Sequence, residues 1–135
     1  MTTIAEVRNE LAEIAGGIGD WFGSSYVGDT VVAGTIKVFR PEFDPRVVFG
    51  GGKMMLTFRC VAYAKRIDSV FSEEALDALA EPSGDGSFIA AVADSTNWSV
   101  TVDFAQVVNV GEVAVVNWGD GTEYLACPFD VEVVW

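Results

Sequence analysis

Two segments of this chain alternate between apolar and polar residues, and that alternation limits the fold more than any other feature of the sequence. Successive side chains of a β-strand point to opposite faces, so a strand with one buried face is apolar at every second position. The apolar sides comprise Leu56, Phe58, Cys60 and Ala62 in the segment 54–64 and Leu125, Cys127, Phe129, Val131, Val133 and Trp135 in the segment 125–135. The opposite sides carry Thr57, Arg59 and Tyr63 in the first segment and Asp130 and Glu132 in the second. The sequence therefore predicts a sheet with one dry face and one acidic, wet face.

The residues just before the second segment predict a β-hairpin. The strand-like stretches 112–118 and 122–126 flank the dipeptide Asp120-Gly121, which favours a two-residue turn that requires positive φ. An earlier alternation places four further residues on one face: Trp98, Val100, Val102 and Phe104. We therefore expect strand over most of the segment 98–135.

Three helices are predicted in addition to the strands. Apolar residues recur at helical spacing near the N-terminus: Ile4, Val7, Leu11, Ile14, Ala15 and Ile18. Thr3 with Glu6 fits a capping box, and the glycines from Gly16 onward end this helix. Trp21, Phe22 and Tyr26 follow it as core or subunit contacts.

Two shorter helices are predicted between the alternating segments. Ser72-Glu73-Glu74 opens the first, because serine caps free N–H groups and carboxylates suit the positive end of the helix dipole, and Pro82 ends it. The segment 87–93 forms the second. The expected fold class is α+β: residues 1–135 form a single domain, a mainly antiparallel β-sheet packed by an N-terminal helix and two short helices.

The composition and the N-terminal residues bear on whether the chain is a membrane protein or a secreted protein. No apolar run approaches the roughly 18 residues of a membrane span, so we expect no membrane association. The first 18 residues carry Glu6, Glu10 and Glu13 and do not form a signal peptide, which predicts a soluble, cytoplasmic product.

The charge is unevenly distributed along the chain. All eight basic residues lie in the first 66 residues beside seven acids, whereas residues 67–135 carry thirteen acids and no base, for a net charge of −12. A sequence-reading DNA binder is excluded, because phosphate affinity needs clustered Lys and Arg. Two interpretations of the acidic bias remain: it provides solubility, or it forms an acidic surface that repels a polyanion or attracts a basic partner.

The residue types present do not indicate catalysis. The chain lacks histidine, which excludes Ser-His-Asp triads, Cys-His pairs and most zinc sites. Cys60 and Cys127 fall on predicted inner faces and are interpreted as small buried apolar residues. Two carboxylate pairs, Asp120 with Glu123 and Asp130 with Glu132, are expected by chance in a chain with twenty acids. We therefore expect no enzyme, no cofactor and no metal site.

The segment 40–53 is predicted to be an extended loop after a strand at 30–39, because its prolines and glycines prevent it from continuing a central sheet strand. It contains an apolar triplet flanked by basic residues: Arg46, Val47, Val48, Phe49 and Lys53. Two interpretations remain: the loop packs on its own domain, or it is an arm that orders on a neighbouring subunit.

The order of these elements resembles the tail terminator proteins of long-tailed phages, especially those of actinobacterial siphophages. The likeness lies in spacing and residue class, without an invariant signature. It is carried by F-G-G-G-K-M-M-L-T-F-R-C-V-A-Y-A-K-R at 49–66, S-E-E-A-L-D-A-L at 72–79, S-F-I-A-A-V at 87–92 and G-T-E-Y-L-A-C-P-F-D-V-E-V at 121–133.

The resemblance implies a homo-oligomer, a hexameric ring that caps the tail tube, stops its polymerisation and offers an attachment surface to the head and neck. Its partners would be the tail tube protein and a head-closure or connector protein, and DNA would pass through without specific binding. Its location would be the head-proximal end of the tail in the virion, and the host cytoplasm during assembly. Two alternatives remain: a head-closure or connector neck protein, and a small β-rich ligand-binding module.

Under this resemblance two groups of residues become candidates for function. The residues predicted to contact a neighbouring subunit or the tube are Arg46, Val47, Val48, Phe49 and Lys53. The acidic residues predicted to face the lumen are Glu112, Asp120, Glu123, Asp130 and Glu132.

Overall fold

The computed structural model describes residues 2–25, 34–43, 49–50, 53–65, 69–117 and 121–135. The helices in these ranges are α1 (Ile4–Gly16), α2 (Ser69–Leu79), α3 (Phe88–Ala93) and the short 3-10 helix η1 (Ser95–Asn97). The strands are β1 (Phe22–Ser24), β2 (Thr35–Val38), β3 (Phe49–Gly50), β4 (Lys53–Lys65), β5 (Phe104–Val110), β6 (Ala114–Asn117) and β7 (Glu123–Val134). The predicted α+β class is confirmed.

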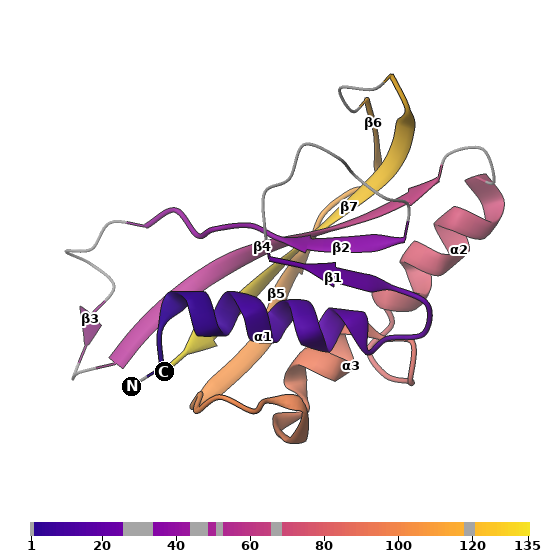
Figure 1. The fold of residues 1–135 in the computed structure, drawn as a ribbon. Coiled ribbons are helices and arrows are strands. Elements are labelled where there is room, and N and C mark those ends of the chain that lie inside the picture. The colour runs from indigo at the N-terminus through magenta and orange to yellow at the C-terminus, as the bar shows by residue number, and fades with distance from the viewer. Residues whose placement is uncertain (1, 26–33, 44–48, 51–52, 66–68, 118–120) are drawn as a thin grey trace.

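The strands form one sheet in the order β1-β2-β4-β7-β5, with β3 added to β4 and β6 added to β7. Only β1 and β2 pair in parallel among the described strands, and the other pairs are antiparallel. The central ladder joins β4 to β7 from Met55–Val134 to Lys65–Tyr124. α1, α2 and α3 lie on one face of this twisted sheet, which we call the inner face, and the opposite face is the outer face (Figure 1).

The inner face of the sheet forms the core, and both alternating segments supply it as predicted. Leu56, Phe58 and Cys60 of β4 are buried there, and alternate residues of β7 lie beside them. Phe129 of β7 meets Phe88 of α3 edge to face, with ring centroids 5.3 Å apart and an interplanar angle of 76°. This geometry is favourable for aromatic pairs. The contact therefore stabilises the packing of α3 on the sheet in addition to the stabilisation from burying the two rings.

Helix α1 has the ends that the sequence predicts. The Thr3 side chain accepts a hydrogen bond from the Glu6 backbone N–H at 3.2 Å, which satisfies one free donor of the first turn. The helix ends at Gly16, and Gly19 adopts a φ of +48° two residues after the cap. Val7, Leu11 and the neighbouring apolar residues are buried against the sheet.

Helix α2 starts at Ser69, so the prediction that Ser72 opens it is wrong. Ser72 is buried inside the helix, and its hydroxyl donates a hydrogen bond to the Lys65 carbonyl at the end of β4. The Ser72 hydroxyl therefore bonds to a strand carbonyl and does not cap the N–H groups at the start of the helix. The predicted helix 87–93 is confirmed as α3, and the Ser87 side chain caps it by accepting a hydrogen bond from the Ala90 N–H at 3.0 Å.

The segment 98–103 is not a strand, which corrects the prediction of strand from Trp98 onward. Its polar groups bond to helices: the Trp98 indole N–H donates to the Val92 carbonyl at 2.9 Å. The Ser99 N–H and hydroxyl both donate to the buried Glu10 carboxylate, at 2.9 and 2.7 Å. These bonds hold the segment along α1 and α3, and strand β5 begins only at Phe104.

The predicted hairpin is present as β6 and β7, and Asn117 with Glu123 is the pair of described residues nearest to its turn. Residues 118–120 lie outside the described ranges, so the predicted two-residue turn stays a prediction. Gly121 has a φ of +81°, the positive value expected for it. Asp120 lies outside the described residues.

Glu10→Ala is expected to lower the free energy of unfolding by about 2 kcal/mol, because it removes two hydrogen bonds to a charged acceptor that is only 6% exposed. Urea denaturation followed by tryptophan fluorescence measures the change. Glu13→Ala is the matched control, since Glu13 is exposed on the same helix. Equal midpoints for the two variants would contradict the role assigned to Glu10.

Candidate interaction surface

The outer face of the sheet carries three rows of paired residues that run across β4, β7 and β5. No helix covers this face in the described ranges. We call the nine residues the outer patch: Met55, Val134 and Phe104 in the first row, Thr57, Glu132 and Gln106 in the second, and Arg59, Asp130 and Asn109 in the third.

The rows of the outer patch differ in chemistry. The first is apolar, and its Met55 and Phe104 side chains are 52% and 44% exposed. In the third, Arg59 Nε lies 3.3 Å from Asp130 Oδ1, and Asn109 Nδ2 donates to Asp130 Oδ2 at 3.3 Å. An exposed pair of this kind contributes little to stability. It does make the wet face mixed in charge, whereas the sequence predicted an acidic one.

Strands β5 and β6 lie end to end along the same side of β7, and together they form one edge of the sheet. β5 pairs with the second half of β7 and β6 with the first half. Between them the Gly111 N–H donates to the Pro128 carbonyl at 2.8 Å, and a Cβ on Gly111 would lie 2.4 Å from Pro128 Cγ. Glycine is therefore required where the two strands meet.

This edge, which we call the β5–β6 edge, is apolar and unpaired. No strand in the described part of the chain lies beyond it. Four of its valines are between 37% and 47% exposed: Val108, Val110, Val113 and Val115. Sequence reasoning assigned these residues to strands but did not single them out. A signal existed in the valine-rich, nearly uncharged run 107–116, a composition typical of segments that recruit another strand.

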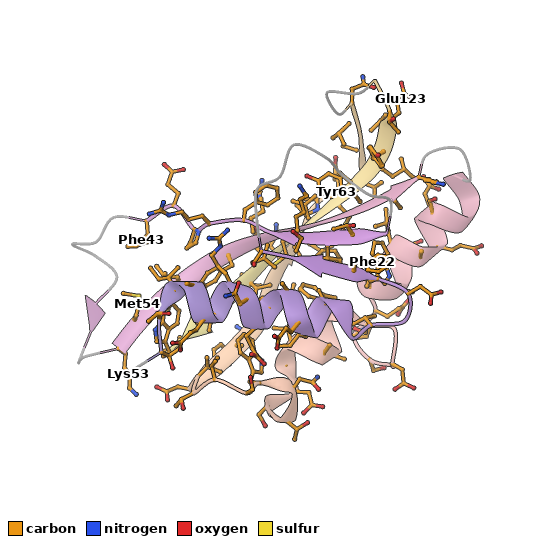
Figure 2. The ribbon with its side chains drawn as sticks, in the orientation of Figure 1. Phe22, Phe43, Lys53, Met54, Tyr63 and Glu123 are labelled. Atoms are coloured by element: carbon orange, nitrogen blue, oxygen red, sulfur yellow. The ribbon has the colours of Figure 1, made fainter. Side chains whose placement is uncertain are left out.

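Among the described strands, β1 is the last one on the opposite side of the sheet, and we call it the β1 edge. Phe22 lies at its start (Figure 2). This residue is 64% exposed, so the core interpretation of Phe22 is wrong. Trp21 is partly buried against the core, and Tyr26 lies outside the described residues. Gly23 packs directly on α1, since a Cβ there would lie 1.7 Å from the Ala12 carbonyl oxygen.

The acidic residues predicted to face a lumen do not gather in one place. Asp130 and Glu132 lie together in the outer patch, and Glu112 is exposed between β5 and β6. Glu123 lies at the far tip of the hairpin (Figure 2), nine residues from Glu132 along β7, or about 30 Å at the rise of a strand. Asp120 lies outside the described residues.

The residues predicted to contact a neighbour are described only in part. Arg46, Val47 and Val48 lie outside the described ranges. Phe49 belongs to β3 and pairs with Met54, so this end of the expected loop is a short strand. Lys53 begins β4, and its Nζ lies 2.6 Å from Asp103 Oδ2 in an exposed ion pair.

The two termini lie close together at one end of the sheet (Figure 1). The residues around them line an open groove of about 880 Å³. The Trp135 indole N–H donates to the Thr2 carbonyl at 2.9 Å, and the Thr2 hydroxyl donates to the Thr101 carbonyl at 2.8 Å. Lys53, Asp103 and Trp135 supply its polar and aromatic lining.

The chemistry available in the described part of the chain is limited. Cys60 and Cys127 are buried and free, and burial raises the pKa of each thiol, so both are protonated near neutral pH and are poor nucleophiles. Within the described residues, His, Cys, Asp and Glu form no group of three that could hold a metal ion.

The fold and the surface together define an α+β domain with helices on one face and exposed apolar groups on its outer face and both sheet edges. Comparisons with protein-family models, with curated proteins and with solved structures gave no match. None of the described helices is long and apolar enough to cross a membrane.

Proposed function

We propose that this chain is the subunit of a ring that caps the tail tube of a long-tailed phage, stops its polymerisation and provides the attachment surface for the neck. The observation that carries the proposal is the β5–β6 edge, which has four exposed valines and no further strand beyond it in the described ranges. Proteins that remain monomeric usually block such edges with charges, proline or a covering segment, because a bare edge recruits another chain. An apolar edge is therefore typical of a subunit of an assembly.

The proposed mechanism depends on which surfaces of the subunit bind to which partners, and it involves no catalysis. A free tube end recruits the next ring, so a terminator must match that end while presenting a different surface on its other side. The outer patch, with its apolar and charged rows, differs in composition from the valines of the β5–β6 edge. One chain thus carries two surfaces of different chemistry, of which we assign the β5–β6 edge to its neighbours.

The acidic bias has a role under this proposal. A channel that carries DNA works better when its wall repels phosphate than when it binds phosphate, and a ring multiplies the charge of −12 on each chain. Asp130 and Glu132 are the lumen candidates that share one face of the sheet. Glu123, at the tip of the hairpin, would lie at a different position along the axis of such a channel.

Purified protein mixed with tails that lack a terminator is expected to bind one end of each tube as a hexameric ring. Light scattering gives the mass of the free protein against the 14.5 kDa of one chain, and negative-stain imaging shows the tube ends. Tails that already carry their terminator are the control and should bind nothing further. A protein that ignores bare tube ends, alone or in excess, would contradict the proposal.

Two other functions have their own tests. A head-closure or connector protein would bind the connector in a pull-down and would not bind the tube protein. The groove between the termini favours a small ligand-binding module. A chain with that function would remain monomeric, and its melting temperature would rise when its ligand is added.

A further inference from the structure

We propose that the free protein is a dimer in which two copies pair through their β5–β6 edges, antiparallel, about a two-fold axis at Val110. Three features of the edge support this contact: its outward backbone groups, the positions of its irregularities and the absence of charge from its two strands. The dimer is independent of the proposed function, whereas its role in assembly rests on that function.

The backbone of the edge offers hydrogen-bonding groups to a further strand. Met54 and Trp135 exchange backbone hydrogen bonds at 2.7 and 2.9 Å, so the odd-numbered residues of β7 bond to β4 and the even-numbered residues bond to β5 and β6. The bond from Gly111 to Pro128 agrees with this alternation. Residues opposite the odd-numbered positions of β7 therefore direct their N–H and C=O groups toward the open edge: Ala105, Val107, Val110 and Val115.

The edge contains two β-bulges, in each of which two of its residues oppose one residue of β7. The first comprises residues 107–108, where the register of β5 shifts by one. The second comprises residues 112–113, which together oppose Cys127. Its limits are fixed by the ladder partners on either side: Gly111 with Pro128 and Ala114 with Ala126. Val110 thus lies midway between the two bulges.

Matched bulges favour a second copy over a straight strand as the partner of this edge. A bulge adds one residue to its strand, so a straight strand would lose register with the edge twice. A two-fold axis at Val110 makes the two edges antiparallel and places residues 107–108 of one copy opposite residues 112–113 of the other. Both strands then carry their extra residue at the same place. The register continues across the contact and joins Val110 to Val110, Val107 to Val113 and Ala105 to Val115.

The contact covers apolar side chains and brings few charges together. β5 and β6 contain no charged residue, and the four exposed valines of each copy lie along the contact. Glu112 lies opposite Val108, so the two Glu112 residues are about 13 Å apart along the strands at the rise of a strand. This separation exceeds the Debye length of about 8 Å at physiological salt, so the repulsion between them is weak.

The dimer gives the apolar edge a partner before the ring forms. An isologous contact uses the same surface on both copies and is complete at two chains, so it cannot extend into a filament. The ring of the proposed function needs the same edge for a neighbouring subunit. The dimer must therefore open before its subunits join a tube end.

Cysteine cross-linking tests the register. Val110→Cys places two thiols opposite each other at the axis, within the Cα separation of a disulfide, so mild oxidation with diamide is expected to convert most of the variant to a covalent dimer. Val115→Cys is the matched control, because Val115 lies on the same edge and is more exposed, 47% against 37%. Alone it should stay reduced, whereas an equimolar mixture with Ala105→Cys should cross-link. Cys60 and Cys127 are buried and do not compete. Non-reducing electrophoresis measures these species.

The mass of the unmodified protein provides a second test. Light scattering of the wild type is expected to give twice the 14.5 kDa of one chain. Val110→Lys is expected to give the mass of one chain, because it places two positive charges at the axis of an edge contact. Met55→Lys adds the same charge at an exposed position of the central strand β4 and should remain dimeric. Circular dichroism verifies that all the variants are folded.

Tubes that lack a terminator test the role in assembly. The oxidised Val110→Cys dimer is expected to leave tube ends bare, and reduction of its disulfide is expected to restore capping. Capping by the oxidised dimer would overturn the requirement that the dimer opens.

Two results would overturn the dimer itself: a wild type with the mass of one chain, and cross-linking of Val115→Cys alone as readily as Val110→Cys. With either result, capping of bare tube ends by the wild type would leave the proposed function in place. A dimer that never binds tube ends, oxidised or reduced, would instead overturn the proposed function and leave the dimer standing.

Discussion

Gly23→Ala is expected to lower the free energy of unfolding by about 3 kcal/mol, at the upper end of what overpacking costs. The added Cβ would lie 1.7 Å from the Ala12 carbonyl oxygen and 2.6 Å from the Ala12 carbonyl carbon. Both are backbone atoms of α1, so no side chain can turn away to make room. Either the helix or β1 must shift, and the β1 edge moves with it.

Urea denaturation measured by circular dichroism and tryptophan fluorescence tests this expectation. Gly86→Ala is the control, because a Cβ on Gly86 meets nothing within 4 Å, and its effect should stay within about 0.5 kcal/mol. A Gly23→Ala chain as stable as the control would show that α1 does not pack against β1 in solution.

Phe129→Ala is expected to cost about 4 kcal/mol, which is typical of removing a buried phenylalanine. The ring is fully buried beneath α3 and makes the edge-to-face contact with Phe88. Its removal from β7 would leave a cavity at the point where the helix layer meets the central ladder, and Cys60 opposite is too small to fill it.

Calorimetry or urea denaturation gives the size of this loss. Phe104→Ala is the matched control, because Phe104 is the same residue type on the adjacent strand with 44% of its surface exposed. Its effect should be about 1 kcal/mol or less. Comparable losses from the two substitutions would mean that Phe104 is packed in solution, so that the outer patch is covered.

The elements predicted correctly are those whose signals are local. Alternation places the dry face of β4 and β7 correctly, because one buried face imposes a period of two on consecutive residues. Thr3 and Ser87 cap their helices through bonds to N–H groups three residues away. Each of these signals lies within a few neighbouring residues.

The errors arise from contacts that reach beyond the few neighbouring residues from which a local signal is read. Ser72 has the residue type and acidic neighbours of an N-cap, but its hydroxyl is bound to the Lys65 carbonyl instead. The alternation after Trp98 resembles a strand, yet Glu10, far away in sequence, takes the Ser99 donors. Nothing near Gly23 in the sequence reveals that α1 touches it.

The interaction surface was less predictable than the fold, because strand order decides which strand is an edge. β5 and β7 have similar apolar patterns in the sequence, but β7 is central and β5 is terminal in the sheet. The exposure of Phe22 has the same origin, since only the order of strands places β1 at the rim. The acidic candidates were identified by residue type, and the structure separates Glu123 from Asp130 and Glu132 along a single strand.

The position of β7 has a consequence for the timing of assembly. β5 and β6 pair with no described strand other than β7, which comprises residues 123–134. During synthesis, β5 and β6 leave the ribosome before β7 and have nothing to pair with until it follows. The β5–β6 edge therefore forms only after β7 has been made, so a nascent chain cannot present this edge before the central ladder of its own core is complete.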